Sequence, residues 1–373
     1  MKDRRLLSLS IILKVAGLLF LLLQFTQLFR YDELQRVHST LYSEQPQTAA
    51  SLVNCPPNLS ADNPLGNKEY KSTPLSELVE TTFTPRSACN ASKKRAWIEN
   101  TILPESITHY AGRKIPKIVH ITSKTKCTTK LFASIVDAWR FANYSLYYHD
   151  EAAVDRLLQR YWSEFPHLQL VLPCMISGAA KADLWRYLVL WEYGGIYTDV
   201  DNLPGPWFRN GTAITDSDDA WFVVEQIGVL SQYFMAASPR HPLLHMCVTM
   251  TFSRLMNLPF IRDQYVPFVT GPGALKQAFA WFMAAQETTT FDRVSKGRYV
   301  GVDGRSVTVV GTRATSNNWI HREAITPRQK FRNYAVMGME HFSRHQRDRR
   351  HNDSCFVEIY RKAATDYGNQ TAT

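Results

Sequence analysis

Residues Gly178–Asp201 read GAAKADLWRYLVLWEYGGIYTDVD, and this stretch decides the fold of the chain. Its first part is rich in Ala and Leu, which favour a helix. Asp183 and Arg186 lie three residues apart and therefore share one helical face. We expect Gly194 and Gly195 to end the helix, because glycine most readily adopts the left-handed cap conformation.

The end of this stretch, Ile196–Asp201, alternates with period two and predicts a strand. Tyr197, Asp199 and Asp201 then point to one side, next to the helix that carries an Asp and an Arg. An Asp-x-Asp pair alone is also common in polar turns. In an otherwise apolar segment, however, buried charges are costly unless they are paired or bind a ligand. Two carboxylates at a strand end also suit a hard divalent cation. The sequence therefore predicts a site here.

Further segments accompany this stretch in a fixed order, and together they resemble glycosyltransferase family 32. That family contains the fungal initiating α-1,6-mannosyltransferases and the inositol-phosphoceramide mannosyltransferases. The glucosyltransferase domains of large clostridial toxins are similar at a greater distance. The resemblance covers roughly residues 113–345. Its segments are IPKIVHITSKT (Ile115–Thr125), WRFANYSLYYHD (Trp139–Asp150), SQYFMAASPRHPLL (Ser231–Leu244) and TGPGALKQAF (Thr270–Phe279).

The expected fold class is α/β. The pattern predicts a strand at Ile115–Ile121, a helix at Lys130–Phe141, a strand at Ser145–Tyr148 and further helices before Gly178. The resemblance implies a GT-A fold, a single Rossmann-like catalytic domain that binds a nucleotide sugar. Ligands of such sheets bind beyond the carboxyl ends of the strands, where Asp199 and Asp201 are expected to lie.

The resemblance also implies roles for the charged residues. Asp201 is expected to bind Mn²⁺ or Mg²⁺ directly, and Asp199 to contact the ribose and a metal-bound water. Asp183 and Arg186 are expected to hold the sugar hydroxyls and the diphosphate side of the donor. An intrahelical salt bridge is the alternative reading of that pair. The other expected donor-binding residues are Ile118 and His120, which would line the pocket for the nucleotide base, together with Tyr197, Gly271 and Pro272.

A C-terminal loop completes the metal site in the family. The best match is GMEHFSRHQ at Gly338–Gln346, which offers Glu340, His341 and Ser343 as metal ligands but has His where the family has an aromatic residue. SNNWIH at Ser316–His321 is the alternative source of a ligand or a stacking ring. A packed neutral imidazole is the alternative role for either histidine.

An apolar stretch at Leu6–Phe29 predicts a transmembrane helix, since it exceeds the length that crosses a core of about 30 Å. Lys14 interrupts it, and its long stem is expected to reach the cytosolic headgroups. Basic residues before the stretch predict a type II protein of the Golgi or ER membrane. A cleaved signal peptide is the alternative. The expected parts are a cytosolic tail (1–5), the anchor (6–29), a lumenal stem (30–112), the catalytic domain (113–345) and a basic tail (346–373).

Cysteines and glycosylation acceptors agree with a lumenal protein. The six cysteines form no C-x-x-C pair, which argues against a zinc site. Disulfides are expected, with Cys174 and Cys247 as candidates for buried thiols. Six Asn-x-Ser/Thr acceptors are compatible with a glycoprotein. They are Asn58, Asn90, Asn143, Asn210, Asn352 and Asn369.

The net charge of +10 comes from dispersed basic residues without an aromatic platform, so nucleic acid is not an expected partner. The resemblance implies a metal-dependent retaining transferase that moves a hexose, with mannose from GDP-mannose favoured, onto a glycan, glycolipid or glycoprotein acceptor. The alternatives are a transferase that uses UDP-galactose or UDP-N-acetylglucosamine, an inactive lumenal protein that binds nucleotide sugar or glycan, and an adhesion module with a structural calcium ion.

Overall fold

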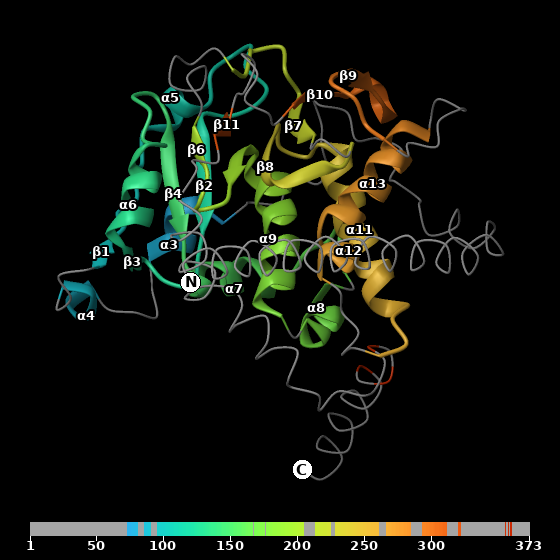
Figure 1. Ribbon diagram of the computed structural model, residues 1–373, viewed down its shortest axis with the longest axis horizontal. Coiled ribbons are helices and arrows are strands. Elements are labelled where there is room, and N and C mark those ends of the chain that lie inside the picture. Colours follow the sequence, from blue (N-terminus) through green and yellow to red (C-terminus); the bar gives the residue numbers. More distant parts are fainter. Residues whose placement is uncertain are drawn as a thin grey trace, which may run out of the picture. The chain divides into compact units, whose positions relative to one another are not determined.

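Seven of the strands that the computed structural model describes form one mixed sheet (Figure 1). All described residues belong to the compact unit Leu59–Thr373. The described residues are 73–80, 86–90, 95–166, 168–175, 177–204, 213–224, 228–260, 266–284, 293–311 and 320–321, together with 355, 357 and 359.

The strand order across the sheet is β4–β2–β5–β8–β7–β10–β9. β2 pairs in parallel with β4 and β5, and β10 with β7, whereas the other neighbours are antiparallel. The carboxyl ends of β4, β2 and β5 therefore meet at one edge of the sheet. The bounds are β4 Ser145–His149, β2 Ile118–Thr122, β5 Gly195–Thr198, β8 Leu230–Ala237, β7 Ala220–Val224, β10 Ser306–Gly311 and β9 Gly297–Val300.

Helices cover one face of this sheet. α9 contacts β5 and β8, α11 packs between α9 and α13, and α13 reaches β8. His149 and Tyr197 point from their strands to this face, where both rings contact Trp185 of α9. The helices of this layer are α7 Glu151–Gln159, α9 Gly178–Tyr193, α11 Pro242–Met256, α12 Val266–Val269 and α13 Pro272–Ala284.

The other face packs against α6 (Lys130–Asp137), which Figure 1 shows beside β4 and apart from α11 and α13. Val136 and Trp139 join Ile196 and Phe234 in one buried apolar cluster there. Ile196 and Tyr197 thus point to opposite faces, as the period-two pattern predicts. The α/β prediction is confirmed, and both faces of the sheet are covered.

The double glycine between α9 and β5 is required by backbone conformation and by space. Gly194 and Gly195 have φ of 63° and 98°, values that L side chains rarely adopt. An added Cβ on Gly194 would lie 2.6 Å from Pro239, and one on Gly195 would lie 2.7 Å from the carbonyl oxygen of Ile118. The predicted helix end is therefore confirmed, and only glycine fits at both positions.

Elements before residue 113 pack on the sheet layer. Helix α3 (Leu75–Glu80) contacts α7 and β4, and β1 (Arg95–Trp97) pairs with β3 (Cys127–Thr129). A Cys89–Cys127 disulfide fastens α4 (Arg86–Asn90) to the same region. The folded part thus begins earlier than the expected domain start at residue 113.

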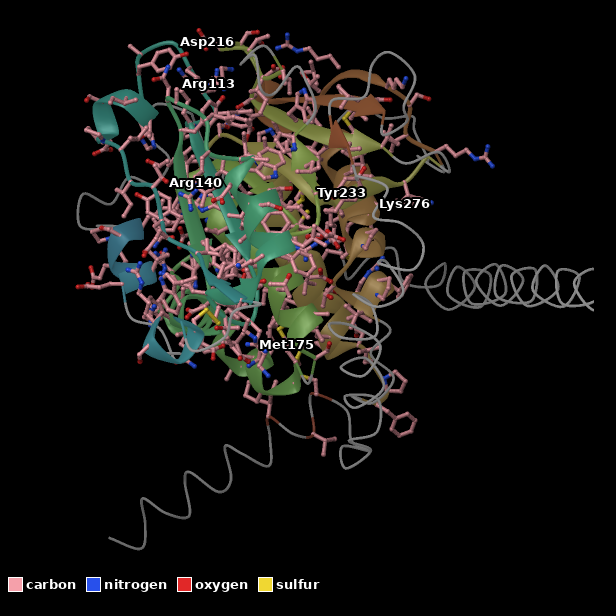
Figure 2. All side chains as sticks on the ribbon, turned by 60° about the vertical axis from the view of Figure 1, so that its left-hand side comes forward. Arg113, Arg140, Met175, Asp216, Tyr233 and Lys276 are labelled. Atoms are coloured by element: carbon pink, nitrogen blue, oxygen red, sulfur yellow. A yellow bond between two sulfur atoms is a disulfide. The ribbon has the colours of Figure 1, made fainter. Side chains whose placement is uncertain are left out.

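Arg113 itself bonds the loop before β7. Its Nη1 lies 3.1 Å from Oδ1 of Asp216, and Figure 2 shows the two side chains together. Tyr110, two residues beyond the short helix α5 (Glu105–Thr108), donates a hydrogen bond of 2.8 Å to the same carboxylate. The segment expected to be the end of a stem is therefore bonded to the sheet layer.

A second disulfide joins Cys174 to Cys355 and ties the expected C-terminal tail to the sheet layer. The prediction of a buried thiol is wrong for Cys174, because it has a partner distant in sequence. It is confirmed for Cys247, a free and buried cysteine of α11. The remaining elements are α8 Leu168–Val171, the 3₁₀ turns Leu172–Cys174 and Val302–Gly304, and the paired strands β6 Leu203–Pro204 and β11 Ile320–His321.

Three predicted boundaries differ from the structure. The strand expected at Ile115–Ile121 begins later, at Ile118, because Pro116 has no backbone N–H to donate to a neighbouring strand. The helix expected to reach Phe141 ends at Asp137. The strand expected to reach Asp201 ends at Thr198, since the chain turns there to bond with β8.

The described part of the chain contains no helix long and apolar enough to cross a membrane. The expected cytosolic tail and the anchor at Leu6–Phe29 lie outside the described residues, as do residues 30–72 of the expected stem.

Candidate active site

An ion pair on α9 forms the base of the candidate site. Ser177 caps this helix through a hydrogen bond from the backbone N–H of Ala179. Asp183 and Arg186 are one turn apart, and Nη2 of Arg186 lies 3.1 Å from Oδ1 of Asp183. Both side chains are largely buried on the side that faces β5. The predicted shared face is therefore confirmed.

The same arginine reaches the strand end. Its Nη2 lies 3.9 Å from Oδ1 of Asp199, and its Cζ lies 4.7 Å from the centre of the Tyr197 ring. The hydroxyl of Tyr197 donates a hydrogen bond of 2.6 Å to Oδ1 of Asp199. Arg186 also donates to the carbonyl of Gln232 on β8 at 3.3 Å. One guanidinium thus links α9, β5 and β8.

A tight turn carries the two carboxylates of the Asp-x-Asp pair. The N–H of Asp199 donates to the carbonyl oxygen of Tyr233 (labelled in Figure 2) at 2.9 Å. Buried Asn202 donates to the same carbonyl at 2.7 Å, and its own carbonyl accepts from Trp139 Nε1 at 2.7 Å. This bonding ends β5 and puts Asp201 in a turn, which corrects its expected place on the strand. Sequence reasoning missed Asn202 because its role depends on β8 and on the residues after α6.

Asp199 and Asp201 are only half-buried, in contrast to the ion pair beneath them. The side chain of Asp199 is 31% exposed. Carboxylate oxygens with this access are suited to a hard divalent cation. The described residues hold no group of three or more metal-ligating side chains. Glu340, His341 and Ser343, the expected further ligands, lie outside the described residues, as does Trp319, and only the backbone of His321 is described.

The loop between α12 and α13 packs against Asp183. The hydroxyl of Thr270 donates a hydrogen bond of 2.7 Å to Oδ2 of Asp183. Gly271 follows in a turn so close that an added Cβ would lie 2.6 Å from Pro267, and Pro272 begins α13. The loop that holds Gly271 and Pro272 thus lies against Asp183, and the contact of these two residues with a donor stays a prediction. Sequence reasoning overlooked Thr270 itself, although it opens the quoted TGPG segment.

Burial shifts the ionisation of the site. Removal from water raises the pKa of Asp183 to about 6, against the opposing effects of Arg186 and Thr270. Burial works to lower the pKa of Arg186, but Tyr197, Asp183 and Asp199 outweigh it, and that pKa is raised. Burial likewise raises the pKa of Tyr197 well above its usual value. At neutral pH Arg186 is therefore a cation, Asp183 is mostly ionised and Tyr197 is a neutral phenol.

Two residues expected to line the base pocket lie inside the protein. Ile118 and His120 are buried on β2. Nε2 of His120 lies 3.0 Å from the carbonyl oxygen of Gly194 and therefore donates to it, and Nδ1 lies 3.2 Å from Nε2 of His149. Burial lowers the pKa of His120 to about 4, so the ring is neutral. The hydrogen bond from this histidine stabilises the turn between α9 and β5, and its contact with the nucleotide base stays a prediction.

Residues 112–206, which contain most of these side chains, match the family described as "Glycosyltransferase sugar-binding region containing DXD motif". The DXD positions correspond to Asp199 and Asp201 in the sequence, so the expected family resemblance is confirmed for this segment.

Two individual proteins are similar to parts of this chain. The initiation-specific alpha-1,6-mannosyltransferase of Candida albicans is 30% identical over 98 residues, which are 25% of this chain and 26% of that protein. The match thus spans about a quarter of the curated relative. The match to the solved structure of PaToxG Glycosyltransferase covers 47% of this chain and 71% of that one, with 18% identity and a TM-score of 0.35.

Proposed function

We propose that the protein is a metal-dependent retaining glycosyltransferase with a GT-A fold. It would move a hexose, with mannose from GDP-mannose favoured, onto a glycan, glycolipid or glycoprotein acceptor. The observation that carries this proposal is that the guanidinium of Arg186 lies next to the carboxylates of both Asp183 and Asp199, inside the sugar-binding region. The favoured sugar follows from the name of the Candida relative.

The exposed carboxylates fit a divalent cation such as Mn²⁺ or Mg²⁺. Asp199 and Asp201 offer hard oxygen ligands in a turn that Asn202 fixes, and phosphate oxygens and water would complete the shell. Glu340, His341 and Ser343 remain proposed ligands. When bound, the cation supplies a positive charge to the departing diphosphate.

The protein's own side chains would bind and orient the donor. Asp183 uses one oxygen for Arg186 and the other for Thr270, and each oxygen keeps a second lone pair for a sugar hydroxyl. Arg186 holds Asp183 and Asp199 in fixed positions, and its cation favours a diphosphate nearby. Ile118, His120, Tyr197, Gly271 and Pro272 remain proposed donor-site residues.

The location of the protein in the cell is part of the same proposal. We place the protein in the Golgi or ER membrane, with Leu6–Phe29 as its anchor and the sugar-binding region in the lumen. The two disulfides favour an oxidising compartment. Asn143, one of the Asn-x-Ser/Thr glycosylation acceptors, is exposed just before β4, which suits a glycoprotein.

Release of nucleotide from a panel of GDP- and UDP-sugars with Mn²⁺ tests the proposal on the purified full chain. We expect release from one donor, its loss on chelation, and a loss of at least about 100-fold in Asp201→Asn. Asp155→Asn, which changes a half-buried carboxylate on α7, is the matched control and should keep full activity. Donor binding without release would instead indicate the inactive binding protein. Calcium binding that nucleotide does not affect would indicate the adhesion module.

A further inference from the structure

The buried carboxylate of Asp183 has two fixed contacts, and they come from different parts of the fold. Arg186 on the same helix contacts Oδ1 at 3.1 Å, and Thr270 from the loop after α12 contacts Oδ2 at 2.7 Å. Two contacts on different oxygens fix both the position and the plane of a carboxylate. The lone pairs that remain then point in defined directions.

The hydroxyl of Thr270 has a choice of acceptors. It lies 3.2 Å from the carbonyl oxygen of Val266 in the preceding helical turn, as well as 2.7 Å from Asp183. A hydroxyl donates one hydrogen bond, and bonds to an ionised acceptor are shorter and stronger than bonds to a neutral one. The geometry therefore assigns the proton of Thr270 to Asp183.

The backbone of Thr270 is held independently of this contact. Its carbonyl accepts from the hydroxyl of Tyr187 at 3.2 Å and from Nε2 of Gln232 at 3.1 Å, and its N–H donates to Val266 at 3.1 Å. Thr270 is fully buried. These bonds fix the loop against α9 and β8, so loss of the hydroxyl alone leaves the loop in place.

We propose that Thr270 is a positioning residue of the donor site, which acts by fixing the carboxylate of Asp183 for the hydroxyls of the transferred sugar. This inference rests on the proposed function. It makes the loop between α12 and α13 part of sugar binding, and it leaves binding of the nucleoside diphosphate to the other residues.

The chain offers a matched control for removal of one hydroxyl. Thr251 on α11 is also fully buried, and its hydroxyl has no hydrogen-bond partner among the described residues. Thr270→Val and Thr251→Val therefore make the same change at two buried sites, one with a charged acceptor and one without. Thr270→Ser keeps the donor and is expected to retain nearly full activity.

The test measures donor turnover, and the binding of GDP-mannose and of GDP, in the full chain with Mn²⁺. We expect Thr270→Val to lower kcat/KM and GDP-mannose affinity about tenfold, with GDP affinity unchanged. Thr251→Val should leave all three at the wild-type level. In an Asp183→Asn background, Thr270→Val should add no further loss, because it acts through that carboxylate. Thr270→Ala serves the same purpose if the valine variant does not fold.

The outcomes separate the two proposals. Wild-type turnover together with normal GDP-mannose binding by Thr270→Val overturns the inference and leaves the function standing. Equal losses for GDP and GDP-mannose, or a full additional loss in the Asp183→Asn background, also overturn it. If no donor is turned over, the proposed function falls. A selective loss of GDP-mannose binding in Thr270→Val would still support the positioning role, and failure of the wild type to bind removes both.

Discussion

Helix α9 carries two buried clusters of charged side chains, and their surroundings differ. In the middle of the helix, Asp183 and Arg186 lie beneath the half-buried carboxylate of Asp199. At its C-terminal end, Glu192 accepts from Arg160 at 3.0 Å and from Arg240 at 2.6 Å. Burial raises the pKa of Asp183 and of Glu192, so neither burial nor a shifted pKa distinguishes the clusters.

Access to water distinguishes them instead. The side chain of Glu192 is 0% exposed, and the two arginines beside it stack on Trp162 and Trp191. Arg240 also pairs with buried Glu164. The cluster at the C-terminal end is thus closed by the fold. The Asp183 cluster instead lies next to the carboxylate of Asp199, which solvent and ligands reach. A solvent-accessible carboxylate beside the buried ion pair is therefore the feature that marks the site.

The largest effect is expected at the closed cluster. Glu192→Gln leaves Arg160 and Arg240 buried with less negative charge, and breaking a buried pair in this way costs about 3–5 kcal/mol. Chemical denaturation should show this loss in the free energy of unfolding. Donor turnover per folded molecule should stay at the wild-type level. A turnover defect in the folded variant would contradict the conclusion that this cluster is structural and plays no part in turnover.

The opposite pattern is expected for Asp183→Asn. After this change Arg186 still has the carboxylate of Asp199 3.9 Å away, so its charge is not left unpaired, and the free energy of unfolding should change by only about 1 kcal/mol. Loss of a charged hydrogen-bond acceptor should lower kcat/KM by about 10- to 100-fold. Parallel denaturation and turnover measurements check both values. Strong destabilisation with normal turnover would make this cluster structural too.

The pH dependence of turnover sharpens the comparison further. Asp183 must be ionised to accept, so kcat/KM should fall about tenfold per pH unit below about 6. A profile that stays flat down to pH 5 would contradict this role.

Protonation of Asp183 does not itself unfold the protein. Its folded pKa lies above the unfolded value of 3.8, so its contribution to stability is full below about pH 4 and is lost as pH rises through about 6. His241 and His245 behave oppositely, because burial lowers their pKa values from 6.5 to about 4. Their contribution is lost as pH falls from 6.5 to 4. Thermal unfolding of the wild type and of Asp183→Asn at each pH separates the two effects, because the variant keeps only the contribution of the histidines.

The smallest effect is expected at the partly exposed ion pair between Lys181, near the start of α9, and Asp155 of α7. Nζ of Lys181 lies 3.7 Å from Oδ1 of Asp155, with side chains 39% and 27% exposed. Such pairs contribute little, so Lys181→Ala should change the free energy of unfolding by no more than about 0.5 kcal/mol. Turnover should also be unaffected. A larger change in either quantity would show that exposure is a poor guide on this helix.

The sequence predicted the parts of the site that are close together in the chain. Asp183 and Arg186 share a face because the helix repeats every 3.6 residues, and Tyr197 and Asp199 share a side because a strand repeats every two. It did not predict that β5 ends at Thr198 or that Asp201 lies in a turn. The bonds that end the strand come from Tyr233, which is distant in sequence.

The amino-acid sequence by itself determined the α9–β5 unit, its double-glycine break and its resemblance to the sugar-binding family, since these depend on local periodicity and on residue types in fixed order. Only the tertiary structure decided the contact of Thr270 with Asp183, the Cys174–Cys355 disulfide and the closed cluster at Glu192. Each joins segments far apart in the chain. Local patterns carry no information about such pairs, because packing of the helices and the sheet brings them together.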